Sequence, residues 1–203
     1  MSKVCCVGLY PKEFAWDYAD KNNDTYKEYL RFLKAEVERY ILDGADRFMS
    51  ILTSGAGADF AKIVIGFREK YPHIRLQVIR TCNNSRKNYP SMEDGLFETL
   101  VNNSNGFLPL DRVEDYIYMI EKCEKILVVW NASEKNTTYK AIKYAQKKNR
   151  NIRYVMLPSK SKRDIKKYYD LYVENPLCVQ ERKEKDDAWK KLIEIEKKMK
   201  NKR

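Results

Sequence analysis

Residues 53–59, TSGAGAD, combine small side chains, hydroxyl groups and one carboxylate in a single short stretch. The stretch follows the largely apolar run 48–52 and precedes an apolar helical pattern that starts at Phe60. Small residues let a ligand approach the backbone, and free N–H groups at a helix start favour an anion such as phosphate. We therefore interpret the stretch as a strand–turn–helix ligand site. The alternative is a plain turn in which Ser54 or Asp59 caps the helix.

A second polar turn, residues 131–136, follows the apolar run 125–130. In open parallel sheets ligands bind beyond the carboxyl ends of the strands, so we expect polar residues at these ends to meet in one cleft. The candidate ligand-binding residues are Gly8, Tyr10, Ser54, Gly55, Gly57, Asp59, Arg80, Thr81, Trp130, Asn131, Ser133, Thr137 and Thr138.

Each type of side chain in this set has a distinct expected role. Ser54 and Thr137 would donate hydrogen bonds to phosphate or ribose oxygens, and Arg80 would add positive charge. Tyr10 or Trp130 would stack on a base. Core packing is the alternative for Trp130, and a helix-start charge favoured by the helix dipole is the alternative for Asp59.

Histidine and cysteine chemistry is poorly supported by the sequence. The single histidine, His73, follows Pro72 in a predicted surface turn, which argues against a histidine triad, base or metal cluster. The five cysteines lack zinc-type spacing, and an odd number favours free thiols. Cys5 and Cys6 are adjacent in a predicted strand, so their side chains point to opposite faces. We expect no catalytic residue, metal site or cofactor beyond a nucleotide-type ligand.

Strands and helices that alternate along the chain would position these residues. Strands are predicted over residues 3–9, 48–52, 75–80, 125–130 and 151–157. Helices are predicted from a cap at Asp24 or Thr25 to about residue 42, then from the small-residue turn to residue 70, and over 92–101, 112–122 and 137–148. Residues 102–106 are predicted to be a loop. This alternation predicts an α/β domain with a mostly parallel sheet covered by helices on both faces.

The domain is expected to occupy residues 1–157, and residues 158–203 form a basic helical extension. Within the extension, residues 186–200 predict an amphipathic helix that docks on its own domain or on a second copy in a homodimer. Such a helix also fits a membrane surface or nucleic acid. The net charge of +11 favours an anionic partner, although a basic soluble surface is the alternative.

The sequence also bears on membrane association and location. No run approaches the roughly 18 apolar residues that a membrane span needs. The first ten residues lack a signal-peptide layout, since their apolar run is short. We therefore expect a cytoplasmic protein with no membrane span.

With these features placed, four segments resemble one superfamily, in the right order along the chain. They are residues 3–11, KVCCVGLYP; 54–59, SGAGAD; 67–78, FREKYPHIRLQV; and 125–145. The chain resembles the SLOG superfamily, and within it the YpsA-like, DUF1273 branch. These are Rossmann-like proteins related to the DNA-processing protein DprA and to the LOG-type phosphoribohydrolases. The resemblance implies a Rossmann-like fold over residues 3–157 and a nucleotide-derived ligand.

The chain departs from that branch at three of its motifs. The usual Gly-His-Arg-Pro is replaced here by Gly8-Leu9-Tyr10-Pro11, the usual Asp-Gly by Asn131-Ala132, and the usual Gly-Thr by Asn136-Thr137. The LOG-type motif Pro-Gly-Gly-x-Gly-Thr-x-x-Glu is absent. The resemblance therefore favours a non-enzymatic binder or sensor of a nucleotide-derived ligand. A degenerate LOG-like N-glycosidase and a DprA-like nucleic-acid binder are the alternatives.

Overall fold

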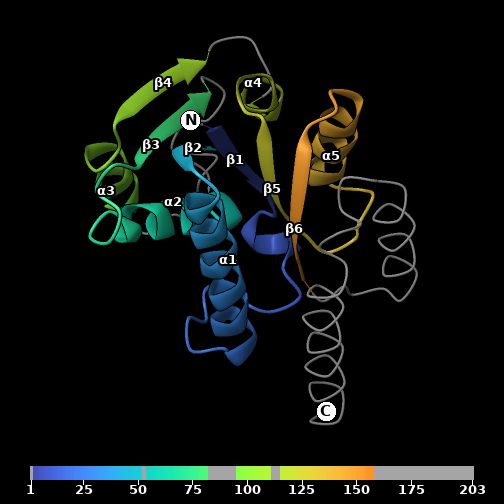
Figure 1. Ribbon diagram of the computed structural model, residues 1–203. Coiled ribbons are helices and arrows are strands. Elements are labelled where there is room, and N and C mark those ends of the chain that lie inside the picture. Colours follow the sequence, from blue (N-terminus) through green and yellow to red (C-terminus); the bar gives the residue numbers. More distant parts are fainter. Residues whose placement is uncertain (1, 52–53, 82–94, 111–114, 158–203) are drawn as a thin grey trace.

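A six-stranded, all-parallel sheet forms the centre of the protein (Figure 1). The computed structural model describes residues 2–51, 54–81, 95–110 and 115–157. The strands are β1 (Ser2–Gly8), β2 (Ala45–Ile51), β3 (Arg75–Thr81), β4 (Gly106–Leu110), β5 (Lys125–Trp130) and β6 (Asn151–Met156). The helices are α1 (Asp24–Leu42), α2 (Ala56–Phe67), α3 (Leu96–Asn102), α4 (Asp115–Lys122) and α5 (Thr137–Lys147), with a 3₁₀ turn η1 (Pro11–Glu13). The predicted Rossmann-like α/β fold is confirmed.

The strand order is β4-β3-β2-β1-β5-β6, so the chain starts in the middle of the sheet. It moves outward from β1 to β4 and then returns to the other side of β1 at β5. Because crossovers between parallel strands are right-handed, this reversal moves the helices to the other face. Helices α1 and α2 pack on one face, and α4 and α5 pack on the other (Figure 1). The reversal between β1 and β5 is called the switch point below.

Strands with helices on both sides must bury both of their faces, which explains their continuous apolar runs. Five of the six residues of β5 are buried, and Val4, Cys5, Cys6 and Val7 are buried in β1. Cys5 and Cys6 are free thiols, as predicted. The central strands are therefore core, and polar chemistry is restricted to their ends.

Helix α1 starts and stops at identifiable polar signals. The Asn23 side chain accepts hydrogen bonds from the backbone N–H groups of Thr25 and Tyr26, at 2.9 and 3.4 Å. Asn23 is thus the cap, and the predicted cap at Asp24 or Thr25 is wrong by one or two positions. The predicted stop at Asp43 and Gly44 is confirmed, with Gly44 at a φ of +83°.

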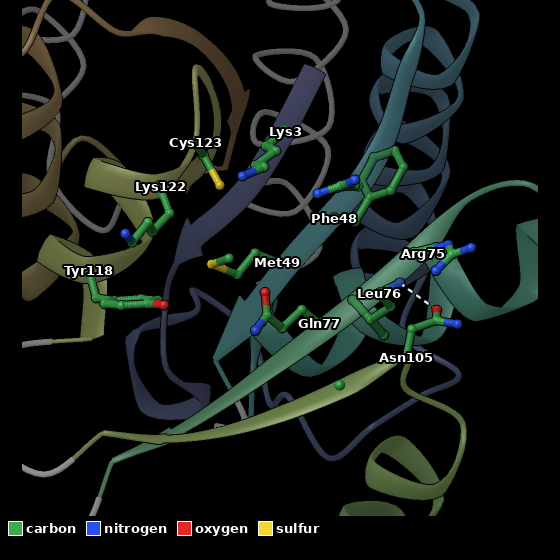
Figure 2. A pocket seen from close by; sticks show the side chains of 12 residues that line it. Lys3, Phe48, Met49, Arg75, Leu76, Gln77, Asn105, Tyr118, Lys122 and Cys123 are labelled. Atoms are coloured by element: carbon green, nitrogen blue, oxygen red, sulfur yellow. Dashed lines mark hydrogen bonds between the residues drawn. The ribbon is translucent and has the colours of Figure 1, made fainter. Parts of the chain in front are cut away.

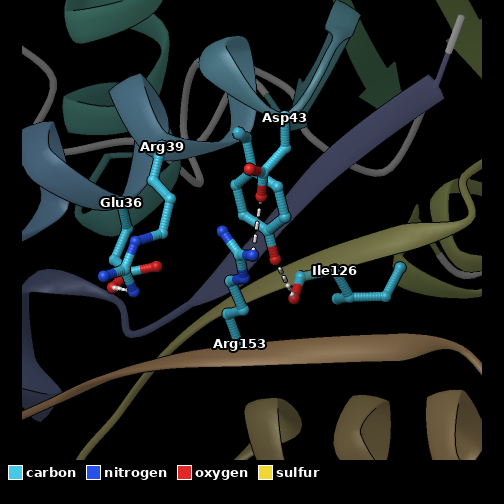
Figure 3. Close-up of polar contacts among 6 residues, drawn as sticks. Glu36, Arg39, Asp43, Ile126 and Arg153 are labelled. Atoms are coloured by element: carbon cyan, nitrogen blue, oxygen red, sulfur yellow. Dashed lines mark hydrogen bonds and ion pairs between the residues drawn. The ribbon is translucent and has the colours of Figure 1, made fainter. Parts of the chain in front are cut away.

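Polar contacts join the C-terminal end of α1 to strands β5 and β6 (Figure 3). The Arg153 guanidinium on β6 lies 2.7 Å from the Asp43 carboxylate and 4.6 Å from the centre of the Tyr40 ring. The Tyr40 hydroxyl donates to the Ile126 carbonyl of β5 at 3.3 Å. These contacts hold the C-terminal end of α1 against β5 and β6.

The edge strand β4 is missing from the sequence prediction. Residues 106–110, GFLPL, contain glycine and proline, which are both unfavourable inside a strand. Proline is tolerated at a sheet edge because one side of an edge strand needs no ladder hydrogen bonds. Among the described strands, β4 pairs only with β3, from Gln77 opposite Gly106 to Thr81 opposite Leu110.

Other predicted boundaries differ by a few residues or fall outside the described chain. α2 ends at Phe67 rather than at residue 70, α3 begins at Leu96, and α5 ends one residue early at Lys147. The predicted residues 92–94, 112–114 and 158–203 lie outside the described residues. The extension and its role in a homodimer therefore stay predictions.

Gly8 tests the packing at the end of β1. A Cβ atom there would lie 2.5 Å from the Ala56 Cβ and 2.9 Å from the Val129 Cβ. We expect Gly8→Ala to lower the free energy of unfolding by about 2 kcal/mol, measured by urea denaturation. Gly66→Ala is the matched control, since nothing lies within 4 Å of a Cβ at that exposed helical position. This control should gain up to about 1 kcal/mol. Equal stability of Gly8→Ala and the parent protein would refute the close packing.

Candidate functional site

The segment that follows β1 joins the loops that follow β2 and β5. The Leu9 carbonyl accepts a hydrogen bond from the Ala56 N–H at 3.0 Å, after β2. The Asn131 side-chain amide, after β5, donates to the Glu13 carbonyl at 2.9 Å. The structure thus brings three of the predicted loops together at the switch point, with residues 9–13 lying between the other two.

Gly55 occupies the tightest position of the β2–α2 turn. Its φ is +94°, and a Cβ there would lie 2.3 Å from the Leu9 carbonyl oxygen. Only glycine fits this backbone and this spacing. Gly55 is the cap residue of α2, so the predicted alternative of Ser54 or Asp59 as the cap residue is wrong. Ser54 is buried, and the Gly57 carbonyl accepts a hydrogen bond from the Ser50 hydroxyl at 2.8 Å.

Asp59 is the buried carboxylate of the site, and three tyrosine hydroxyls surround it. Tyr18 and Tyr29 donate to its Oδ2 at 2.9 and 3.2 Å, and Tyr26 donates to its Oδ1 at 3.0 Å. Only 2% of Asp59 is exposed. Within the described chain no lysine or arginine forms an ion pair with it. The Lys21 ammonium instead lies over the rings of Tyr18 and Tyr26, 3.7 and 4.4 Å from their centres.

Burial decides the protonation balance of this cluster. Burial raises the pKa of Asp59, and the hydrogen bonds from Tyr18 and Tyr26 act in the opposite direction. Burial, and after it the Asp59 carboxylate, raises the pKa of Tyr18 and of Tyr29. The tyrosines therefore remain protonated donors, and Asp59 connects α1 and the segment after β1 to the first turn of α2. These contacts account for Asp59 without a ligand.

On the other side of the switch point, two asparagines organise the β5–α5 turn. Asn136 caps α5 by accepting from the Tyr139 N–H at 2.9 Å. The Asn131 Oδ1 atom accepts from the Ser133 N–H at 3.2 Å and from the Asn136 amide at 3.4 Å. Asn136 was missed as a site residue, although asparagine directly before a helical pattern is a recognised cap signal.

Trp130 lies inside the core, which confirms core packing, the alternative to base stacking that the sequence left open. Its side chain has no exposed surface, and its indole N–H donates to the Ser133 carbonyl at 3.0 Å. The ring stacks on Tyr139, with centres 6.0 Å apart and planes inclined by 17°. The indole thus packs against the β5–α5 turn from the core side, and neither face of the ring is open to a base.

The remaining candidates differ in how accessible they are. Tyr10 is 37% exposed, Thr137 is exposed and Ser133 is half-buried, whereas Thr138 is buried. Arg80 and Thr81 are the last two residues of β3. Strand β2 lies between β3 and β1, so these two residues are one strand further from the switch point. Among the candidate side chains at the switch point, those of Tyr10, Ser133 and Thr137 are therefore accessible.

The described residues contain no group of three or more His, Cys, Asp or Glu side chains that could hold a metal ion. His73 is exposed and lies against Tyr71 just before β3, which is the opposite end of the sheet.

Among the helices that the structure describes, none combines the length and the apolar character that crossing a membrane requires.

Comparison of the sequence with protein-family models and with curated proteins gave no match. The fold and the switch point define the chain as a Rossmann-like protein with a parallel α/β sheet.

Replacing Asp59 by asparagine tests the protonation balance of the cluster. Because the folded-state pKa of Asp59 is raised above 3.8, the folded protein holds this proton more tightly than the unfolded chain does. The stabilisation that protonation gives is therefore present below pH 3.8 and is lost as the pH rises through the folded-state pKa. The amide of the Asp59→Asn variant does not titrate, so the parent protein should lose stability relative to this variant between acidic and neutral pH.

Urea denaturation at a series of pH values measures this difference. Asp24→Asn, at an exposed position of α1, controls for removal of a carboxylate without burial. A parent protein that gains stability relative to Asp59→Asn as the pH rises would contradict the raised pKa.

Proposed function

We propose that the protein is a non-enzymatic binder or sensor of a nucleotide-derived ligand at the carboxyl ends of β1, β2 and β5. The meeting of three loops at the switch point of a parallel sheet carries this proposal, because Rossmann-like sheets bind nucleotides there. The resemblance to the SLOG superfamily supports the same class of ligand.

The first turn of α2 is the proposed phosphate contact. The cap residue Gly55 has no side chain to cap this turn, and the positive end of the helix dipole favours an anion. The Leu9 carbonyl oxygen already accepts from the Ala56 N–H. A ligand oxygen must bind beside this carbonyl or displace it, so we expect modest affinity.

The ribose and the base would then extend toward α5. Thr137 is exposed at the first position of α5 and would donate from its hydroxyl, together with the Ser133 hydroxyl. Tyr10 is the exposed aromatic ring of this region and would stack on the base. Trp130 is left out of this role because it is enclosed.

Two carboxylates near these loops, those of Asp59 and Glu13, already accept hydrogen bonds, which favours binding over bond cleavage. Asp59 is held by three tyrosines, and Glu13 accepts a hydrogen bond from the Tyr10 N–H at 2.7 Å. Neither is placed as an acid or base for an N-glycosidic bond, and the LOG-type glutamate motif is absent from the sequence. Nucleic-acid binding rests on the net charge of +11 alone.

Titration calorimetry with ADP-ribose tests the proposed site. Thr137→Glu places a carboxylate at the switch point in a position that the helix dipole tolerates, so α5 should remain stable. We expect this variant to bind ADP-ribose at least about tenfold more weakly, because like charges would face each other. Gln146→Glu adds the same charge at the other end of α5 and should bind as the parent does.

Three results would contradict the proposal. They are no heat of binding at millimolar ADP-ribose and ATP, equal weakening by both variants, or release of free base detected by chromatography. Base release would favour the N-glycosidase instead.

A further inference from the structure

A concave site lies at the amino end of the sheet, away from the switch point. It has a volume of about 400 Å³ and is formed by the first residues of β1 to β4 together with the end of α4 (Figure 2). We call it the amino-end groove. Its lining residues that carry the argument are Lys3, Arg47, Arg75, Gln77, Tyr118 and Lys122.

The strand register places three cations in one row across this groove. Lys3 on β1 is opposite Arg47 on β2, and Arg47 is opposite Arg75 on β3. Neighbouring strands lie about 4.8 Å apart, and paired positions present their side chains on the same face of the sheet. Lys122, in the last turn of α4, adds a fourth cation from above that face.

Little negative charge compensates this row. Lys3, Arg75 and Lys122 form no ion pair within the described part of the chain, and Arg47 reaches the Asp46 carboxylate only at 4.0 Å. The Glu124 carboxylate is bound to the Lys3 backbone N–H at 2.7 Å. Like charges at directly opposite strand positions destabilise a sheet, so an anion that binds between them would gain from relieving their repulsion.

The rest of the lining fits a small organic molecule better than an extended polymer. Met49 and Cys123 are buried apolar residues of the lining, and the side chains of Gln77 and Tyr118 form no hydrogen bond to other described residues. In Figure 2, Tyr118 and Lys122 of α4 lie across from Met49 and Gln77 of the sheet. Apolar walls with a few free polar groups, at this volume, are typical of small-molecule sites.

We propose that the amino-end groove binds a small organic molecule that carries two or more phosphate or carboxylate groups. The anionic groups lie between the row Lys3–Arg47–Arg75 and Lys122, and the body of the ligand packs on Met49. This site is independent of the proposed function, because β1 separates Lys3 from Gly8 by roughly 17 Å.

Titration calorimetry with tripolyphosphate and with citrate tests the groove and separates phosphate from carboxylate ligands. We expect one bound anion per chain for at least one of these probes. The double variant Arg75→Gln/Lys122→Gln should bind the anion at least about tenfold more weakly, since charged hydrogen bonds are lost. Gln77→Glu keeps all cations but adds a negative charge to the groove, and it should weaken binding similarly.

The matched control is Lys27→Gln/Lys62→Gln, which removes two charges from exposed positions of α1 and α2 on the other face of the sheet. It should bind as the parent does, and thermal melting should show that every variant is folded. No binding of either probe at millimolar concentration would overturn the proposal, as would equal weakening by the control. A single-stranded oligonucleotide that binds through the same residues, more tightly as it lengthens, while neither probe binds, would also overturn it in favour of a nucleic-acid surface.

Discussion

The buried carboxylate of Asp59 determines how the loops of this protein fit together. Three tyrosine hydroxyls reach it from two preceding segments: Tyr18 from the connection after β1, and Tyr26 and Tyr29 from α1. A carboxylate that forms no ion pair with a described residue is costly to bury, and the hydroxyl donors offset that cost only if all three segments are in place. The first turn of α2 is thereby joined to the connection that crosses the switch point.

This constraint explains why the carboxyl end of the sheet is well packed. The connection after β1 touches Gly55 on one side and Asn131 on the other, and no side chain larger than hydrogen fits at Gly55. A ligand would therefore meet a preformed turn and the exposed groups of Tyr10 and Thr137. The amino end differs, because there the strand register collects cations that few carboxylates neutralise.

The sequence predicts the central strands well, since a parallel sheet covered on both faces needs continuous apolar runs such as KILVVW in β5. It does not predict β4, because Gly106 and Pro109 are unfavourable in a strand. A strand with these residues is tolerated here because β4 lies at the edge of the sheet. The caps at Asn23 and Asn136 were missed, although local sequence signals them. Local patterns reveal neither the tyrosine cluster, whose members lie 30 to 41 residues from Asp59, nor the cation row, which depends on register between strands.

A titration of the full chain with ADP-ribose, followed by the backbone amide chemical shifts in ¹H–¹⁵N correlation NMR spectra, tests ligand binding at the switch point most directly. If a nucleotide-derived ligand binds there, the largest shifts will fall on the backbone amides of Gly57 and Ala58 in α2 and of Ser133 and Thr137 in the β5–α5 turn. Shifts confined to the amino end of the sheet, around Arg75 and Gln77, or no shift at millimolar ligand, would contradict binding at the switch point.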